Sequence, residues 1–255
     1  MAILIKSQAD IERMRVSGGV VAAVHRAMEA LIAPGVTTGE LDREARRIIE
    51  QAGGSPSFLG YHGYPGAICA SVNEEVVHGV PGDRTLKDGD IISIDVGVYL
   101  DGFHGDAAAT YAVGTIEPRL KALIDAAKLA FEAGVAEAYA GQRVGDISAA
   151  IQESIERGGY GVVRGYGGHG VGRKMHEDPS VPNYGTAGSG ARLQPGMTLA
   201  IEPMLTLGDA EVRELDDGWT VVTVDGLASS HYEHTVLITE GVPELLTQLV
   251  EEMVY

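Results

Sequence analysis

Two carboxylates occupy one short apolar stretch of the chain, and no basic residue lies near them in sequence. The stretch 91–106 reads IISIDVGVYLDGFHGD and contains Asp95 and Asp106. Its alternation predicts a β-strand with the apolar residues at 92, 94, 96 and 98 facing a core and Asp95 on the opposite face. No Lys or Arg occurs between Lys87 and Arg119. Because an unpaired buried carboxylate is costly, a cation of another kind must neutralise these acids.

The second half of the chain carries a matching pair of acids. LKDGDIISID at 86–95 aligns with LQPGMTLAIE at 193–202, which places Glu202 on Asp95. HGDAAAT at 104–110 aligns with HYEHTVL at 231–237, which places Glu233 on Asp106. No Lys or Arg follows Arg213, so the second pair also lacks a basic neighbour in sequence.

An amphipathic helix is predicted before each pair of strands. PGVTTGELDREARRIIEQAGG at 34–54 resembles AGQRVGDISAAIQESIERGGY at 140–160. The apolar stripes are Leu41, Ala45, Ile48 and Ile49 in the first helix, and Ile147, Ile151 and Ile155 in the second. We infer an α+β duplication in one compact unit, with halves at roughly 7–115 and 116–245. The four acids are expected to converge near a pseudo-twofold axis.

A histidine between glycines supplies a fifth candidate ligand. The glycines of GYGGHGVGRKMHEDP (165–179) let the backbone approach closely and expose the imidazole of His169. Four carboxylates and one imidazole exceed the needs of one tetrahedral ion, but they suit two ions about 3.5–4 Å apart with bridging carboxylates. This mostly oxygen set favours Mn, Fe, Co or Zn over a thiolate-type structural zinc. Each acid could instead cap a turn or pair with a distant arginine, which is easier to accept for one acid than for the symmetric set.

Composition excludes several classes of function. The formal net charge of −17 argues against a nucleic-acid binder, which needs basic patches. No apolar run approaches the roughly 20 residues of a membrane span, and the apolar stretch before Lys6 is too short for a signal peptide. Cys69 is the single cysteine, so no internal disulfide can form. These features predict a cytoplasmic protein without membrane or nucleic-acid partners.

Seven positions together resemble the methionine aminopeptidases. They are His78 in NEEVVHGVPG, Asp95 and Asp106 in IDVGVYLDGFHGD, His169 in GGHGVG, His176 in MHEDP, Glu202 in IEPM and Glu233 in YEHT. The resemblance covers nearly the whole chain and implies the pita-bread fold, a duplicated α+β domain over residues 1–255. The short interval between His176 and Glu202 leaves no room for the helical insertion of type II members, so a bacterial-style type I enzyme is implied.

The resemblance also implies a cofactor and a reaction. Two divalent ions (Co, Mn, Fe or Zn) would be held by Asp95, Asp106, His169, Glu202 and Glu233, with Asp106 and Glu233 bridging. Activated water would attack the first peptide bond of nascent polypeptides and release the initiator methionine when the second residue is small.

Several side chains have predicted roles around that reaction. Glu202 would be the general base, and His176 and His78 would bind the developing oxyanion and the scissile amide. Without the resemblance, His78 is equally well read as a loop histidine. His104 and His231, two residues from the bridging acids, are expected to hydrogen-bond to the ligands. The remaining histidines, His25, His62 and His234, are assigned either structural roles or hydrogen bonds that support the ligands from behind.

The methionine side chain needs an apolar pocket. SFLGYHGYPGAIC at 57–69 supplies Phe58, Tyr61, Tyr64 and Cys69, and Trp219 lies between two later strands. Spacing alone favours core packing for this cluster, whereas the resemblance favours a pocket wall. Phe58 and Met175 stand where relatives carry other residues, so the shape of the pocket is open.

Two other functions remain open. A proline-specific aminopeptidase shares the fold and metals, but it usually has an added N-terminal domain that 255 residues cannot hold. A metal-free binding module on the same fold would have lost ligands, and all five are present. Transient contact with the ribosome is implied for bacterial relatives. The stretch LGDAEVRELDDG (207–218) is acidic where a bacterial relative can be basic, which disfavours docking through that loop.

Overall fold

Two similar halves make up the described part of this computed structural model, residues 3–248. The ends of the predicted domain, Met1, Ala2 and residues 249–255, lie outside it. The first half contains α1 (Gln8–Leu31), α2 (Thr38–Gln51), β1 (Ser55–Pro56), a 3₁₀ turn η1 (Tyr61–Gly63), β2 (Cys69–Val72), β3 (Glu75–Val77), β4 (Ile91–Leu100) and β5 (Phe103–Ala112).

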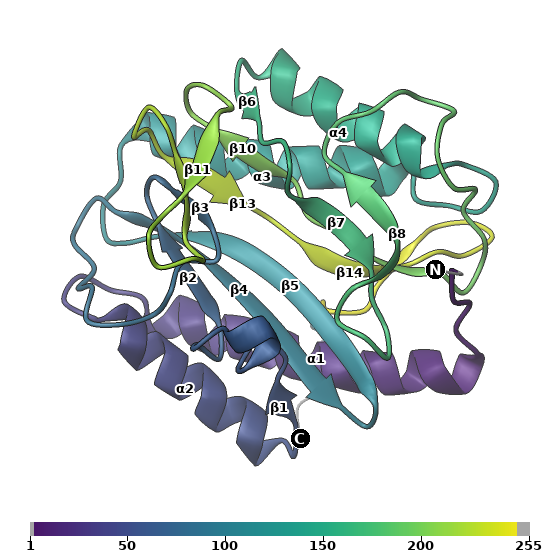
Figure 1. Ribbon diagram of the computed structural model, residues 1–255, viewed down its shortest axis with the longest axis horizontal. Helices are drawn as coiled ribbons and strands as arrows, with labels where there is room; N and C mark the ends of the chain where they lie inside the picture. The colour runs from purple at the N-terminus through teal and green to yellow at the C-terminus, as the bar shows by residue number, and fades with distance from the viewer. Residues whose placement is uncertain (1–2, 249–255) are drawn as a thin grey trace.

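The second half again begins with two helices, α3 (Pro118–Ala136) and α4 (Val144–Arg157). Its strands are β6 (Gly161–Val162), β7 (Gly167–Gly170), β8 (Glu177–Pro182), β9 (Thr198–Ile201), β10 (Met204–Thr206), β11 (Val212–Glu214), β12 (Val221–Thr223), β13 (Ser229–His231), β14 (His234–Leu237) and β15 (Glu244–Leu245). In Figure 1, α1 and α2 lie below the strands and α3 and α4 above them, and this arrangement shows the duplication.

Antiparallel strands form the centre of each half. β4 and β5 pair along their whole length as a long hairpin, and β1 and β2 pair with β4. In the second half the order β15-β14-β9-β7-β8 forms a five-stranded sheet, and β13-β10-β6 forms a smaller one. β12 pairs with both β11 and β3, so this fourth sheet contains strands of both halves.

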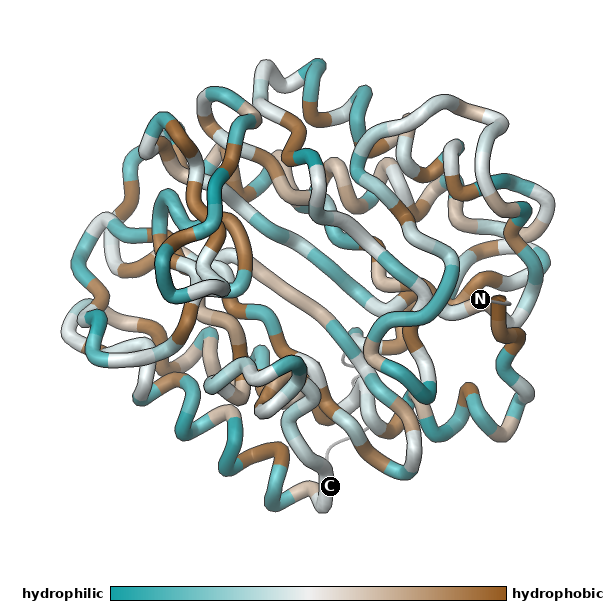
Figure 2. The backbone as a smooth tube through the Cα atoms, viewed as in Figure 1, coloured by the Kyte–Doolittle hydropathy of each residue, from teal (hydrophilic) through white to brown (hydrophobic). Residues whose placement is uncertain are grey.

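The predicted apolar stripes face the interior. In α2, Leu41, Ala45 and Ile49 are fully buried, whereas Ile48 is only half-buried. Figure 2 shows the resulting alternation of hydrophobic and hydrophilic residues along this helix. Thr37 caps α2, since its hydroxyl accepts a hydrogen bond from the backbone N–H of Glu40. In α4 the buried stripe is Ile147, Ile151 and Ile155, as predicted.

The alternation of β4 decides which face of the hairpin is polar. Ile92, Ile94, Val96 and Val98 are completely buried in the first-half core, together with residues of α1 and α2. A separate core between α3, α4 and the second-half strands contains Phe131 and Ile151. Because side chains alternate along a strand, the remaining face of β4 presents Asp95 to the interface between the halves.

Candidate metal centre

Three carboxylates from both halves meet at the centre of the molecule. Asp95 on β4 and Asp106 on β5 are diagonal neighbours on one face of the hairpin, since Asp95 pairs with Ala108 and Asp106 with Gly97. Glu233 lies at the break between β13 and β14. One carboxylate oxygen from each of Asp95, Asp106 and Glu233 lies within 4.8 Å of the others.

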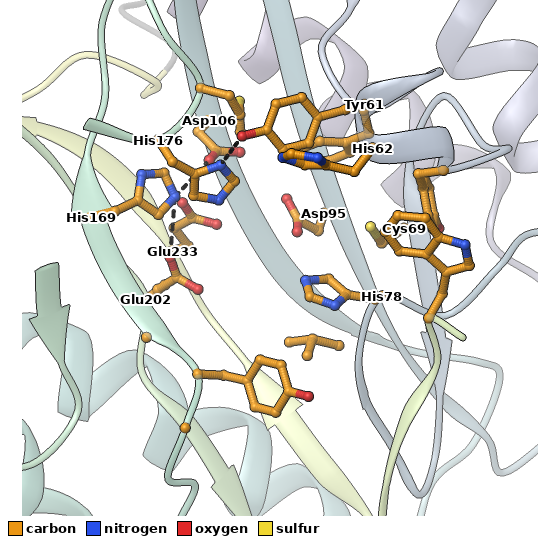
Figure 3. Close-up of a pocket in the computed structure, with 18 residues that line it drawn as sticks. Tyr61, His62, Cys69, His78, Asp95, Asp106, His169, His176, Glu202 and Glu233 are labelled. Atoms are coloured by element: carbon orange, nitrogen blue, oxygen red, sulfur yellow. Dashed lines mark hydrogen bonds and ion pairs between the residues drawn. The ribbon is translucent and has the colours of Figure 1, made fainter. Parts of the chain in front are cut away.

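The other two predicted ligands adjoin this triad. His169 on β7 pairs with Ala200 of β9, and Glu202 directly follows the end of β9. Nε2 of His169 lies 3.6 Å from Oδ2 of Asp106 and 3.6 Å from Oε1 of Glu202. Nδ1 of His169 donates to the carbonyl of Gly170 at 2.8 Å, so the proton resides on Nδ1. Nε2 therefore faces the acids with a free lone pair, and Figure 3 shows this arrangement.

Gly168 allows β7 to approach β9 this closely. A Cβ atom at Gly168 would lie 2.2 Å from the carbonyl oxygen of Ala200, a separation that side-chain atoms do not adopt. Any larger residue would push β7, and with it His169, away from the acids. The glycine-rich context noted in the sequence is therefore a packing requirement of the strand that carries the imidazole.

Burial makes this cluster electrostatically unfavourable without a cation. Burial raises the pKa of Asp95 to about 7, and burial together with neighbouring acids raises the pKa of Asp106 and of Glu233 well above the ordinary values. The pKa of Glu202 is raised for the same reasons, whereas burial lowers the pKa of His169 to about 3. A neutral imidazole among four acids is a ligand set and not a set of ion pairs.

Several polar atoms of the cluster have no partner among the described residues. Oδ1 of Asp95, Oδ1 of Asp106 and Oε1 of Glu233 are fully buried and accept no hydrogen bond within residues 3–248. Leaving such atoms unsatisfied is costly, and a divalent cation with oxygen and nitrogen ligands would satisfy all of them. The residues present therefore fit a metal site, in the way that the distribution of acids in the sequence predicts.

Two histidines face the cluster from the cavity side. The ring of His176 lies 4.1 Å from that of His169, and its Nδ1 is 2.9 Å from the hydroxyl of Tyr61. His78 follows β3 and has a left-handed backbone with φ of 59°. Such a conformation is unfavourable for a non-glycine residue and is concentrated at functional sites. Burial lowers the pKa of both His78 and His176, which keeps their rings neutral near pH 7.

A cavity of about 330 Å³ opens in front of the acids. One side is polar and is lined by all five predicted ligands, Asp95, Asp106, His169, Glu202 and Glu233. The other side is aromatic and apolar. All predicted pocket residues line this cavity, namely Phe58, Tyr61, Tyr64, Cys69 and Trp219. Tyr64 packs edge-on against Trp219 with ring centroids 5.2 Å apart, and Met175 completes the buried part of the wall.

Some residues lie elsewhere than the sequence suggests. His62, assigned a structural or supporting role, lines the cavity itself. Tyr166 also lines it, and sequence reasoning missed this residue although it lies in the glycine-rich segment before His169. Nδ1 of His104 lies 2.8 Å from the hydroxyl of Ser57 and not beside a ligand, and the ring also packs against Tyr99. Nε2 of His231 lies 3.8 Å from Oε2 of Glu233 and 3.9 Å from Oε2 of Glu202. Both distances are too long for a hydrogen bond.

The last two histidines are structural, as expected. Nε2 of His25 donates to the carbonyl of Ala107 at 2.9 Å, and Nδ1 of His234 lies 2.8 Å from the hydroxyl of Thr247. Both rings are half-buried, and neither lines the cavity in front of the acids. Across residues 3–248 the helices are too short or too polar to span a membrane.

Fold and site together define a pita-bread metallopeptidase. Residues 12–240 match metallopeptidase family M24, and the chain belongs to that family. It is 50% identical to methionine aminopeptidase 1 of Bacillus subtilis over 97% of this chain and 100% of that protein. The crystal structure of methionine aminopeptidase from Thermotoga maritima superposes with a TM-score of 0.96 at 47% identity, covering 97% of this chain and 100% of that one.

A prolidase from Pyrococcus furiosus shares the fold alone. Its TM-score is 0.77 at 22% identity, and the match covers 97% of this chain but only 66% of the prolidase. The predicted resemblance to methionine aminopeptidases and the predicted fold are thus confirmed. The chain is a metal-dependent peptidase.

Proposed function

We propose that this protein removes the N-terminal methionine from nascent polypeptides whose second residue is small. The observation that carries the proposal is the position of the buried acids at the polar end of a cavity whose other end is aromatic and apolar. Similarity to methionine aminopeptidases over nearly the full length of both chains supports the same substrate class. The substrate's methionine would occupy the apolar end, with its peptide bond beside the acids.

The ligand set divides into two overlapping groups. Asp95, Asp106 and Glu233 form the first, and Asp106, His169 and Glu202, joined by Glu233, form the second. Two divalent ions, Co, Mn, Fe or Zn, would be held by these groups, with Asp106 and Glu233 shared between them. A bound pair of this kind supplies a Lewis acid and a water molecule that ionises near neutral pH.

Three side chains of the cavity would take part in the reaction, one as a general base and two as hydrogen-bond donors. Glu202 accepts the proton of the attacking water and returns it to the leaving amine. If Tyr61 donates to Nδ1 of His176, Nε2 of that ring carries the proton and can donate to the developing oxyanion. His78 faces the same cavity and can donate to the scissile amide. The lowered pKa values of both histidines suit these neutral donor roles.

The methionine side chain would pack against Phe58, Tyr61, Tyr64, Cys69 and Trp219. A thioether gains modestly from aromatic contacts, about 0.3–1.5 kcal/mol each. The residue after the cleaved bond would lie beside the metal ligands and His176, where bulky side chains are disfavoured. The whole chain would act as one catalytic domain, residues 1–255, with halves at about 7–115 and 116–245. It would work in the cytoplasm and meet the ribosome at most transiently.

A peptide series tests this proposal. Release of free methionine is measured for Met-Ala, Met-Gly and Met-Ser peptides against Met-Lys, Met-Leu and Met-Phe peptides, with an Ala-Pro peptide alongside. We expect cleavage of the first three only. Preferential cleavage of Ala-Pro would identify a proline-specific enzyme instead. Protein stripped of metal and reconstituted with each ion separately would show which ions restore activity, and a protein that binds no metal would be a binding module.

A further inference from the structure

A buried ion pair joins the N-terminal segment to the turn that carries His176. Nζ of Lys6 lies 2.6 Å from Oε2 of Glu177, and the two side chains are only 5% and 4% exposed. Glu177 directly follows His176 in the chain. The pair lines neither the cavity nor the metal centre, so the proposed reaction does not use it directly.

The surroundings of Lys6 are built from glycines. A Cβ atom at Gly172 would lie 2.5 Å from Cε of Lys6, and one at Gly196 would lie 3.0 Å from its carbonyl oxygen. The backbone N–H of Lys6 donates to the carbonyl of Gly196 at 2.8 Å. The lysine side chain therefore lies directly against the backbone of the turn, which leaves no space for a bulkier residue on either side.

The carboxylate of Glu177 hydrogen-bonds both to the turn between β7 and β8 and to Lys6. Its Oε1 accepts a hydrogen bond from the backbone N–H of Lys174 at 3.1 Å, while its Oε2 accepts from Lys6. The turn places Met175 and His176 in the cavity wall. A second, more exposed ion pair joins this turn to the first turn of α1. Nη2 of Arg173 lies 2.9 Å from Oδ1 of Asp10. In Figure 1 the N-terminal segment lies on the side of the molecule where β8 begins.

We propose that Lys6 is a positioning residue for His176, acting through Glu177. This inference rests on the proposed role of His176 as an oxyanion donor. Breaking a buried ion pair leaves one charge unpaired in a site that excludes water, so the turn must open to solvate it. A small displacement of a group that acts on the transition state is expensive, about 10²-fold in rate for 1 Å.

The first test is a double-mutant cycle on kcat. Lys6→Met preserves the length of the side chain and removes its charge. We expect kcat for a Met-Ala peptide to fall about 10–100-fold, with bound metal unchanged. In a His176→Ala background the same substitution should cause no further loss. An equal loss in both backgrounds would show that Lys6 acts elsewhere and would overturn the proposal.

The matched control is the exposed pair. Asp10→Asn removes the charge that pairs with Arg173 from the first turn of α1, while its side-chain oxygen can still accept from Ser7 in the helix cap. Exposed ion pairs contribute little, so kcat should change less than twofold. A loss as large as that of Lys6→Met would mean that any contact between the two segments suffices, which contradicts a specific role for Lys6. If Lys6→Met does not fold, Glu177→Gln can replace it, because this substitution keeps the size of the side chain and removes its charge. Its effect on kcat is then measured in the wild-type and His176→Ala backgrounds.

A second measurement is independent of activity. Hydrogen–deuterium exchange of residues 171–177 in metal-free protein should be faster in Lys6→Met than in wild type and unchanged in Asp10→Asn. Unchanged exchange in Lys6→Met would overturn the proposal. A wrong assignment of the proposed function would give a different result. Wild-type protein would then release no methionine, while Lys6→Met would still show faster exchange than wild type.

Discussion

Glu233 and Ala108 exchange a pair of backbone hydrogen bonds. The N–H of Glu233 donates to the carbonyl of Ala108 at 2.8 Å, and the N–H of Ala108 donates back at 3.3 Å. Ala108 also pairs with Asp95 across the β4–β5 hairpin. Ala108 thus holds Glu233 of the second half close to Asp95 of the first half. This contact brings acids of both duplicated halves into a single site.

Removal of Asp106 should abolish activity and metal binding together. Its carboxylate belongs to both overlapping ligand groups, and the Asp106→Ala variant would lose a bridging ligand. We expect less than one bound ion per chain by elemental analysis and no detectable release of methionine. Asp125→Ala, on the exposed surface of α3, is the control and should match wild type. Two bound ions and normal turnover in Asp106→Ala would refute the assigned centre.

Replacing His176 should affect turnover without affecting metal content. Loss of one oxyanion donor costs about 10²–10³-fold in rate, so kcat of His176→Ala should fall by that factor. Tyr61→Phe removes only the hydroxyl that contacts Nδ1 of His176 and should cost less. Elemental analysis of each variant separates the two possible roles, since loss of an ion from His176→Ala would make the residue a ligand.

Metal-free protein should become less stable as the pH rises from 6.5 to 8. The folded-state pKa of Asp95 is raised from 3.8 to about 7, so its stabilising contribution is present at low pH and is lost as the pH rises through 7. Asp106, Glu202 and Glu233 act in the same direction. Five histidines with strongly lowered pKa values act in the opposite direction, mainly below about pH 6.5, because there the unfolded chain binds protons that the folded protein does not. They are His25, His104, His169, His231 and His234.

Thermal unfolding in a chelator at pH 6.5 and pH 8 measures this effect. The free energy of unfolding should fall by up to about 1.4 kcal/mol per pH unit for each titrating acid. Saturating Mn²⁺ or Co²⁺ should stabilise the protein more at pH 8 than at pH 6.5, because protons compete for the ligands. Asp95→Asn should weaken the pH dependence. A metal-free protein that is more stable at pH 8 than at pH 6.5 would contradict the raised pKa values of the four buried acids.

The aromatic wall should contribute to binding more than to turnover. Trp219→Ala removes the ring that packs against Tyr64, and the thioether of the substrate would lose an aromatic contact. A contact made equally in substrate and transition state changes KM, so we expect KM for a Met-Ala peptide to rise about 2–10-fold with kcat nearly constant. A selective fall in kcat would place Trp219 at the reacting bond instead of in the side-chain pocket.

Patterns along the linear chain predict the acids of the site, although not every residue that lines its cavity. Asp95, Asp106, Glu202 and Glu233 could be selected because strand alternation, local absence of bases and internal repetition are all properties of the linear chain. Alternation also fixes the buried face of β4, because successive side chains must point to opposite sides of a strand. The stripe of α4 is equally local, since residues three to four positions apart share one helix face.

Contacts between side chains of distant segments depend on how the elements pack in three dimensions. His104, which the sequence places near the ligands, contacts Ser57 instead, whereas His62, whose backbone is left-handed, lines the cavity. The contact of Lys6 with Glu177 joins positions 171 residues apart. No periodicity predicts such pairs, because the distance between them depends on how sheets and helices pack and not on the pattern within any one element.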